Sequence, residues 1–241
     1  MRVFNWFRSL GSPVTPSRKL RSRAAKNDAT KVALEELAPS VLPYLGLVAY
    51  LELEVYEATT RAVAAAPSLE AKDVLSTAAG LALQKQQAFA EEIRRRGHEP
   101  HTVMAPYTGV IDRYLARIEG STWHEIVLSV YLIAGLFDDF FARLGAGVND
   151  RFSAEAVRIL QGPTGRERVA ELLTAEIAQD PPLGDLLALW GRRLVGDTLL
   201  TARGVLSLSE NRIIDEAEAE PVFTELIADH IRRMDALGLT A

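Results

Sequence analysis

The sequence contains no cysteine and only four histidines among its 241 residues. Without cysteine there can be no disulfide framework, no thiolate metal site and no cysteine nucleophile. This composition is typical of a reducing compartment, so we expect a cytoplasmic protein. No histidine lies in the middle of an expected helix opposite a carboxylate, and His124 and His230 are expected at the surface. The histidines are His98, His101, His124 and His230.

Long apolar runs are also missing. The two longest are 41–51, which contains Pro43, and 126–137, which stops at Asp138. Both are shorter than the ~20 apolar residues that a membrane-spanning helix needs, so they indicate buried core helices. The N-terminus has no continuous apolar stretch of the kind found in a secretory signal. The sequence therefore predicts neither a transmembrane segment nor secretion.

Positive charge is concentrated at the N-terminus. Residues 1–31 carry a net charge of +7, and the rest of the chain carries −12. We expect a basic, disordered arm at 1–28, followed by a helical domain at 29–241. A basic arm on an acidic body can also make weak contact with RNA or an anionic surface.

Proline and glycine divide the chain into helices and predict an all-α fold. Ser68 is placed to cap one helix, Gly97 to end it, and Thr122 with Glu125 has the spacing of a capping box. The segment Gly162-Pro163-Thr164-Gly165 interrupts a further helical stretch. The expected helices are 43–66, 69–96 and 122–144, the broken stretch 150–179, a short helix at 30–38, another at 108–119 after a loop at 98–107, and C-terminal helices at 183–206, 210–218 and 221–237.

The first candidates for chemistry are acidic side chains on two of these helices: Glu52, Glu54 and Glu57 on 43–66, and Asp138 and Asp139 on 122–144. Glu52 lies four residues after Val48 and three before Val55, so it shares their apolar helix face. Glu54 and Glu57 fit a solvent-facing position better. The pair His98 and His101 has metal-like spacing, but Pro100 lies between them and indicates a surface loop.

Four short stretches resemble an actinobacterial group of ferritin-like proteins that is described as similar to MiaE, the di-iron hydroxylase of a modified tRNA adenosine. They are Ala49-Tyr50-Leu51-Glu52-Leu53, Trp123-His124-Glu125, Asp139-Phe140-Phe141 and 189–197 (LWGRRLVGD), and the resemblance covers about 40–205. It implies a ferritin-like four-helix bundle with additional C-terminal helices. In such bundles, inward carboxylates and Glu-x-x-His pairs hold two metal ions.

The ligand positions of this family are degenerate here. Glu52 is the one ligand-like position that survives. The resemblance places Lys85 and Arg166 where the two acid-x-x-His pairs would lie, and Ile133-Ala134 near the remaining acid. Basic residues repel a metal ion, so no cofactor is expected. We hypothesise a buried charge cluster in which Lys85 and Arg166 pair with Glu52; the alternative is that Lys85 extends to solvent.

Nothing in the sequence marks a catalytic residue, and several functions remain open. The first is a non-catalytic binding or scaffold protein, which could form a homodimer through 183–206. The second is a di-iron or manganese hydroxylase acting on a modified tRNA adenosine. The third is an RNA-associated protein that uses the arm at 1–28.

Overall fold

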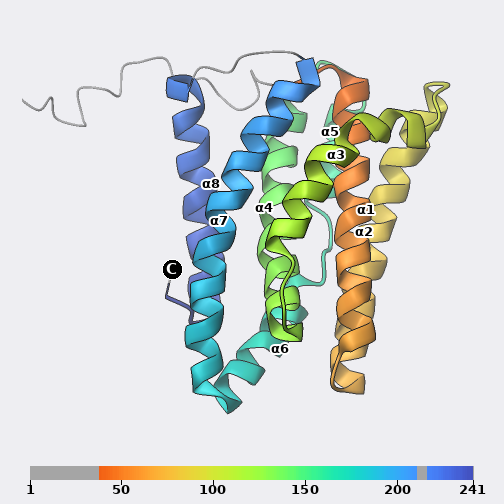
Figure 1. Ribbon diagram of the computed structural model, residues 1–241. Helices are drawn as coiled ribbons and strands as arrows, with labels where there is room; N and C mark the ends of the chain where they lie inside the picture. The colour runs from red at the N-terminus through yellow and green to blue at the C-terminus, as the bar shows by residue number, and fades with distance from the viewer. Residues whose placement is uncertain (1–37, 211–215, 241) are drawn as a thin grey trace, which may run out of the picture. The chain divides into compact units, whose positions relative to one another are not determined.

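The computed structural model describes residues 38–210 and 216–240, with side chains at 38–198 and 224–240. This part of the chain contains α-helices and no strand (Figure 1). The helices are α1 (Val41–Ala65), α2 (Leu69–Arg95), α3 (Pro100–Ile118), α4 (Trp123–Ala146), α5 (Ser153–Leu160), α6 (Arg166–Gln179), α7 (Pro181–Glu210) and α8 (Glu216–Ala236). The expectations for 1–28 and for most of 30–38 fall outside the described residues.

The helix ends follow the local signals. Ser68 Oγ accepts a hydrogen bond from the Ala71 amide at 3.1 Å at the start of α2. Thr122 and Glu125 form both halves of a capping box at the start of α4. Gly97 follows α2 with a φ of 79°, a left-handed conformation that glycine adopts without strain. These three predictions are confirmed.

Four helical walls enclose the bundle core. The helices α1 and α2 form an antiparallel hairpin, α4 packs on α1, and α5 and α6 together complete the fourth wall against α2 and α4 (Figure 1). The break between α5 and α6 lies at 161–165, as expected from the glycines and Pro163. Buried aromatic rings fill one end of this core, with Tyr44 packed edge-on against Phe89 and Phe141.

The remaining helices cover the other side of α1 and α4. The helix α3 packs on α1 and α7, while α7 and α8 pack on α4. No helix in the described part of the chain is long and apolar enough to span a membrane.

Two helix predictions are wrong. The expected loop at 98–107 is the first half of α3, which starts at Pro100 and continues through Pro106. Proline is well suited to the first turn of a helix, where its missing N–H would have no partner. The buried residues Pro100, Tyr107, Ile111 and Tyr114 form a stripe at helical spacing, which favours a helix on both sides of Pro106. Near the C-terminus, α8 (Glu216–Ala236) runs as one helix across 219–220, where we expected a break between helices at 210–218 and 221–237.

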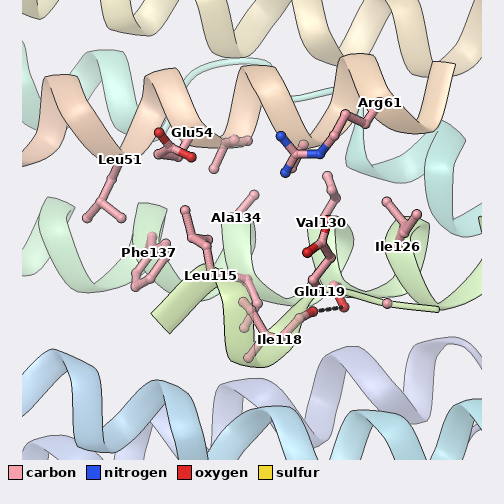
Figure 2. Close-up of a pocket in the computed structure, with 15 residues that line it drawn as sticks. Leu51, Glu54, Arg61, Leu115, Ile118, Glu119, Ile126, Val130, Ala134 and Phe137 are labelled. Atoms are coloured by element: carbon pink, nitrogen blue, oxygen red, sulfur yellow. Dashed lines mark hydrogen bonds between the residues drawn. The ribbon is translucent and has the colours of Figure 1, made fainter. Parts of the chain in front are cut away.

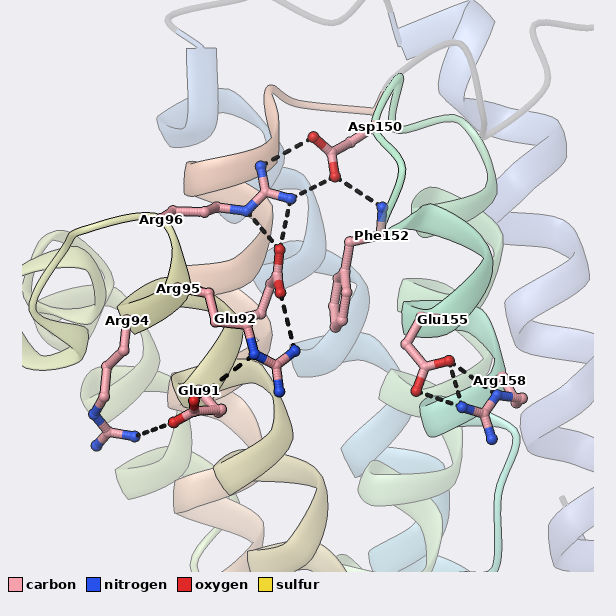
Figure 3. A network of polar contacts seen from close by, with 9 residues as sticks. All are labelled: Glu91, Glu92, Arg94, Arg95, Arg96, Asp150, Phe152, Glu155 and Arg158. Carbon is pink, nitrogen blue, oxygen red and sulfur yellow. Dashed lines mark hydrogen bonds and ion pairs between the residues drawn. The ribbon is translucent and has the colours of Figure 1, made fainter.

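An ion network joins the end of α2 to the segment that precedes α5 (Figure 3). The Arg96 guanidinium contacts the buried Glu92 at 2.8 Å and Asp150 at 2.5 Å. Asp150 also accepts a hydrogen bond from the Phe152 amide at 2.8 Å. The network thus fixes the start of α5, which forms one part of the fourth wall, against the end of α2.

Candidate functional site

Four charged side chains meet in the centre of the bundle, one from each wall. Glu52 comes from α1, Lys85 from α2, Asp138 from α4 and Arg166 from the first turn of α6. All four line one small cavity with about 410 Å³ of empty space, part of it open to solvent. We call these residues the central cluster.

Lys85 and Asp138 form the shortest contact of the central cluster. Lys85 Nζ lies 2.5 Å from Asp138 Oδ1, and the two side chains are 7% and 5% exposed. The ammonium also donates to the carbonyl oxygen of Leu160 at 3.3 Å. Leu160 is the last residue of α5, so its carbonyl has no partner further along the same helix. The break in the fourth wall therefore supplies an acceptor for the buried lysine.

Glu52 points into the bundle and is 6% exposed. The pKa of Glu52 is raised to about 8, first by burial and then by the negative charge of Asp138, while the charges of Lys85 and Arg166 oppose the rise. A hydrogen bond between the two carboxyl groups also favours the protonated form of Glu52. At neutral pH, Glu52 thus holds a proton and acts as a donor to Asp138.

Arg166 faces the same aspartate from the adjacent wall, which α5 and α6 form. Its Nη1 lies 3.8 Å from Asp138 Oδ2, and its Nε and backbone amide donate to Thr164 Oγ1 at 3.1 and 3.2 Å. Our hypothesis placed both cations on Glu52, but the ion pairs of Lys85 and Arg166 go to Asp138. A neutral Glu52 attracts them less than the ionised Asp138 does, which explains the difference.

Asp138 is the member that our hypothesis of a buried charge cluster left out. The resemblance had placed the acid of this helix near Ile133-Ala134. Tyr131, Ala134 and Asp138 all line the central cavity, and their spacing of three and four residues is that of one helix face. Continuing that face from Ala134 by one turn would have identified Asp138.

The chemistry of these donors does not fit a di-iron centre. Two carboxyl groups share a hydrogen bond, and an ammonium and a guanidinium approach one of them. A pair of divalent ions requires several anionic oxygens and imidazoles, and nearby cations would repel it. Gln84 and Gln87 are exposed on α2. Within the described ranges 38–210 and 216–240, no three His, Cys, Asp or Glu residues are grouped to hold a metal ion.

The other candidate residues lie away from the central cluster. Glu57 is exposed and Glu54 is half-buried, while His98 and His101 are both exposed. His124 Nε2 lies 3.2 Å from a Glu176 carboxylate oxygen. The expectation for His230 is wrong, because it is 1% exposed. His230 packs between α8 and α7, with Nε2 3.0 Å from the Gly191 carbonyl oxygen, and burial lowers its pKa.

A second, larger pocket opens between α1, α3 and α4 (Figure 2). It encloses about 650 Å³ of empty space, part of it open to solvent. Apolar side chains form most of its wall, and Glu54, Arg61 and Glu119 lie among them. Val55, Val130 and Ala134 line both this apolar pocket and the central cavity. These three small side chains are thus the partition between the two spaces.

Comparison with known proteins supports the fold. Residues 36–214 match the model of a family described as "Ferritin-like domain, actinomycetes". No curated protein matches the chain. The matched region includes α1 to α7, and it contains every member of the central cluster. The chain therefore belongs to the actinomycete family of ferritin-like domains, and the prediction of an all-α ferritin-like bundle is confirmed.

Proposed function

We propose that this ferritin-like protein is a non-catalytic binding protein in which a lysine–aspartate pair occupies the place of the di-iron centre. The observation that carries the proposal is the position of Lys85 Nζ, 2.5 Å from Asp138 Oδ1 between α2 and α4. Both side chains are almost fully buried. An ammonium at this position neutralises the carboxylate that a metal ion would need.

The central cluster is better suited to holding the walls together than to turning over a substrate. Lys85 joins α2 to both α4 and the end of α5. Arg166 adds the first turn of α6 to the same aspartate. The cluster thus links walls that the break at 161–165 would otherwise leave less well connected. Removing one member of a buried ion pair leaves an uncompensated charge, so each partner depends on the other.

The apolar pocket is the part of the bundle that supports a binding role. Its wall is mostly apolar with a few polar groups, which is the composition of small-molecule sites. Figure 2 shows Glu54, Arg61 and Glu119 projecting beside apolar side chains such as Leu115 and Phe137. We propose an apolar small molecule with one polar group as the occupant.

Metal analysis of the purified full-length protein tests the first half of the proposal. Cells are grown with added iron and manganese, and the protein is analysed by mass spectrometry for bound metal and by absorption spectroscopy. We expect no stoichiometric metal and no change in melting temperature on adding a chelator. Stoichiometric iron or manganese, or an oxo-bridge absorption band, would contradict the proposal and favour the hydroxylase that acts on a modified tRNA adenosine.

Binding of the neutral dye Nile red tests the second half. Ala58 lines the apolar pocket on α1, and Ala64 is exposed on the same helix. We expect Ala58→Phe to fill the pocket and abolish dye fluorescence, and the matched control Ala64→Phe to leave it unchanged. Circular dichroism establishes that both variants are folded. Equal dye binding by the two variants would show that the pocket is not the site.

Other expectations stay predictions. A homodimer through α7 would use Leu186 and Leu189, which are 62% and 61% exposed. Sedimentation of wild type and Leu189→Asp would detect it as a loss of mass in the variant. Cytoplasmic location and contact of the arm at 1–28 with RNA also remain predictions, and deletion of that arm tests the second by salt-dependent RNA retention.

A further inference from the structure

Two arginine side chains from different helices meet at Gly135 on α4. A methyl group placed on Gly135 would lie 2.5 Å from Arg166 Nη1 and 2.5 Å from Arg233 Nε. Because each nitrogen would lie 2.5 Å from that same methyl position, the two nitrogen atoms are at most 5.0 Å apart. Arg166 extends from α6 and Arg233 from α8. The absence of a side chain at Gly135 is what allows the two guanidinium groups to approach each other.

Each guanidinium keeps a buried donor without an acceptor. Arg166 Nη1 and Arg233 Nη1 are both buried and have no hydrogen-bond partner among the described residues. Arg233 Nη2 donates to the Gly135 carbonyl oxygen at 3.0 Å and to Asp139. The nearest acid to Arg166 is Asp138, at 3.8 Å, and Asp138 is already bonded to Lys85. Buried donors of this kind cost free energy unless an acceptor satisfies them.

The charges around Gly135 are also unequal. Lys85, Arg166 and Arg233 are cations, whereas Asp138 and Asp139 are the acids paired with them. Lys85 and Asp138 are buried, and the other three are partly buried. Burial raises the pKa of Glu52 to about 8, which favours its uncharged form at neutral pH. Glu167 also acts on this region but is exposed to water, which screens its charge. The cations of this group thus outnumber its acids by one.

We propose that Arg166 and Arg233 bind a small oxyanion beside Gly135, either inorganic phosphate or a carboxylate. Guanidinium groups bind such anions through parallel N–H donors, and two of them supply four or more directed bonds. Arg166 also lines the central cavity together with Tyr131 and Thr164, whose hydroxyl groups are further potential partners for the anion. The site is independent of the apolar pocket, so it goes beyond the binding function proposed above.

Thermal unfolding of the full-length protein in different salts tests the site. Sodium phosphate, sodium acetate and sodium chloride are compared at equal ionic strength and pH. We expect a saturable rise in melting temperature with phosphate, with acetate or with both, relative to chloride. Phosphate alone would identify a phosphate site, and acetate alone a carboxylate site. No difference between the three salts would overturn the proposal.

Variants at the two arginines show whether the effect comes from this site. We expect Arg166→Gln and Arg233→Gln each to weaken anion binding by about tenfold or more, since each removes a charge-assisted hydrogen bond. Gly135→Ala should do the same, because the added methyl group displaces both guanidinium groups. Arg232→Gln is the matched control, as Arg232 is 67% exposed on the same helix as Arg233.

Direct titration separates a binding defect from a folding defect. Isothermal titration calorimetry with the active anion, at a temperature where each variant is folded by circular dichroism, gives the dissociation constant without reference to stability. Unchanged affinity in Arg166→Gln and Arg233→Gln would overturn the proposal. So would an equal loss of affinity in Arg232→Gln, because that would indicate a general charge effect.

Discussion

Lys85 on α2 and Asp138 on α4 form a buried ion pair across the centre of the bundle, with Nζ 2.5 Å from Oδ1. The carbonyl oxygen of Leu160, released at the end of α5, accepts a second hydrogen bond from the same ammonium. One lysine thus connects three walls of the bundle. This relationship explains how a ferritin-like fold can keep charged residues at its centre without the ligand set of a di-iron site.

Removing one partner of this pair should be strongly destabilising. We expect Lys85→Met and Asp138→Leu each to lower the free energy of unfolding by roughly 3–5 kcal/mol, since either change leaves a buried charge unpaired. The double variant should recover part of that loss, because no charge is then left. Urea unfolding of the three variants measures the coupling.

An exposed pair provides the control for that experiment. Arg158 and Glu155 form an ion pair on α5 whose side chains are 75% and 40% exposed (Figure 3). Arg158→Ala should cost much less than Lys85→Met, because water screens such pairs. If Lys85→Met costs no more than Arg158→Ala, the buried pair does not have the structural role argued here.

Glu52 should make stability fall as the pH rises. Its pKa is raised from 4.5 to about 8 by burial and by the charge of Asp138. Between these two values the folded protein holds a proton that the unfolded chain has lost, so the free energy of unfolding decreases with pH and levels off above the folded pKa. Glu52→Gln is neutral throughout, and its stability relative to wild type should increase across this range in urea titrations. Parallel pH profiles would contradict the assignment.

Replacing glycine by alanine should have opposite effects on stability at Gly46 and at Gly80. A methyl group on Gly46 of α1 would lie 2.4 Å from the Val103 carbonyl oxygen of α3, a backbone atom that cannot move alone. One on Gly80 of α2 would meet nothing within 4 Å. We expect Gly46→Ala to separate α1 from α3 and cost about 1–3 kcal/mol. Gly80→Ala should stabilise α2 by roughly 0.5–1 kcal/mol. Melting temperatures that shift in the same direction would refute this packing.

Asp150 should contribute stability that acid removes. Its hydrogen bonds from Arg96 hold the pKa of Asp150 below its ordinary value of 3.8. As the pH falls, the unfolded chain therefore takes up this proton before the folded protein does. The stability that ionised Asp150 contributes is present above pH 3.8, and it is lost as the pH falls through the folded pKa of Asp150. We expect Asp150→Asn to cost roughly 1–3 kcal/mol at neutral pH, and the gap to wild type to narrow in acid. Glu155→Gln, at an exposed position, is the matched control, and a gap that stays constant with pH would rule out the linkage.

Local signals in the sequence were sufficient for the main helices. Ser68, Gly97 and the capping box at Thr122 act on their own backbone neighbours, so no knowledge of the fold is needed to interpret them. The same holds for the break before Arg166. The start of α3 was missed because proline both ends helices and begins them, and the buried stripe that decides between the two depends on packing against α1 and α7.

The sequence by itself determined that α2 carries Lys85 and that α6 begins with Arg166, because residue identity needs no coordinates. Tertiary structure decided which acid receives those cations, and it selected Asp138 rather than Glu52. It also decided that His230 is buried and that Arg166 and Arg233 meet at Gly135. Such pairings depend on the relative height and rotation of different helices, which packing of the whole bundle sets and no single helix can specify.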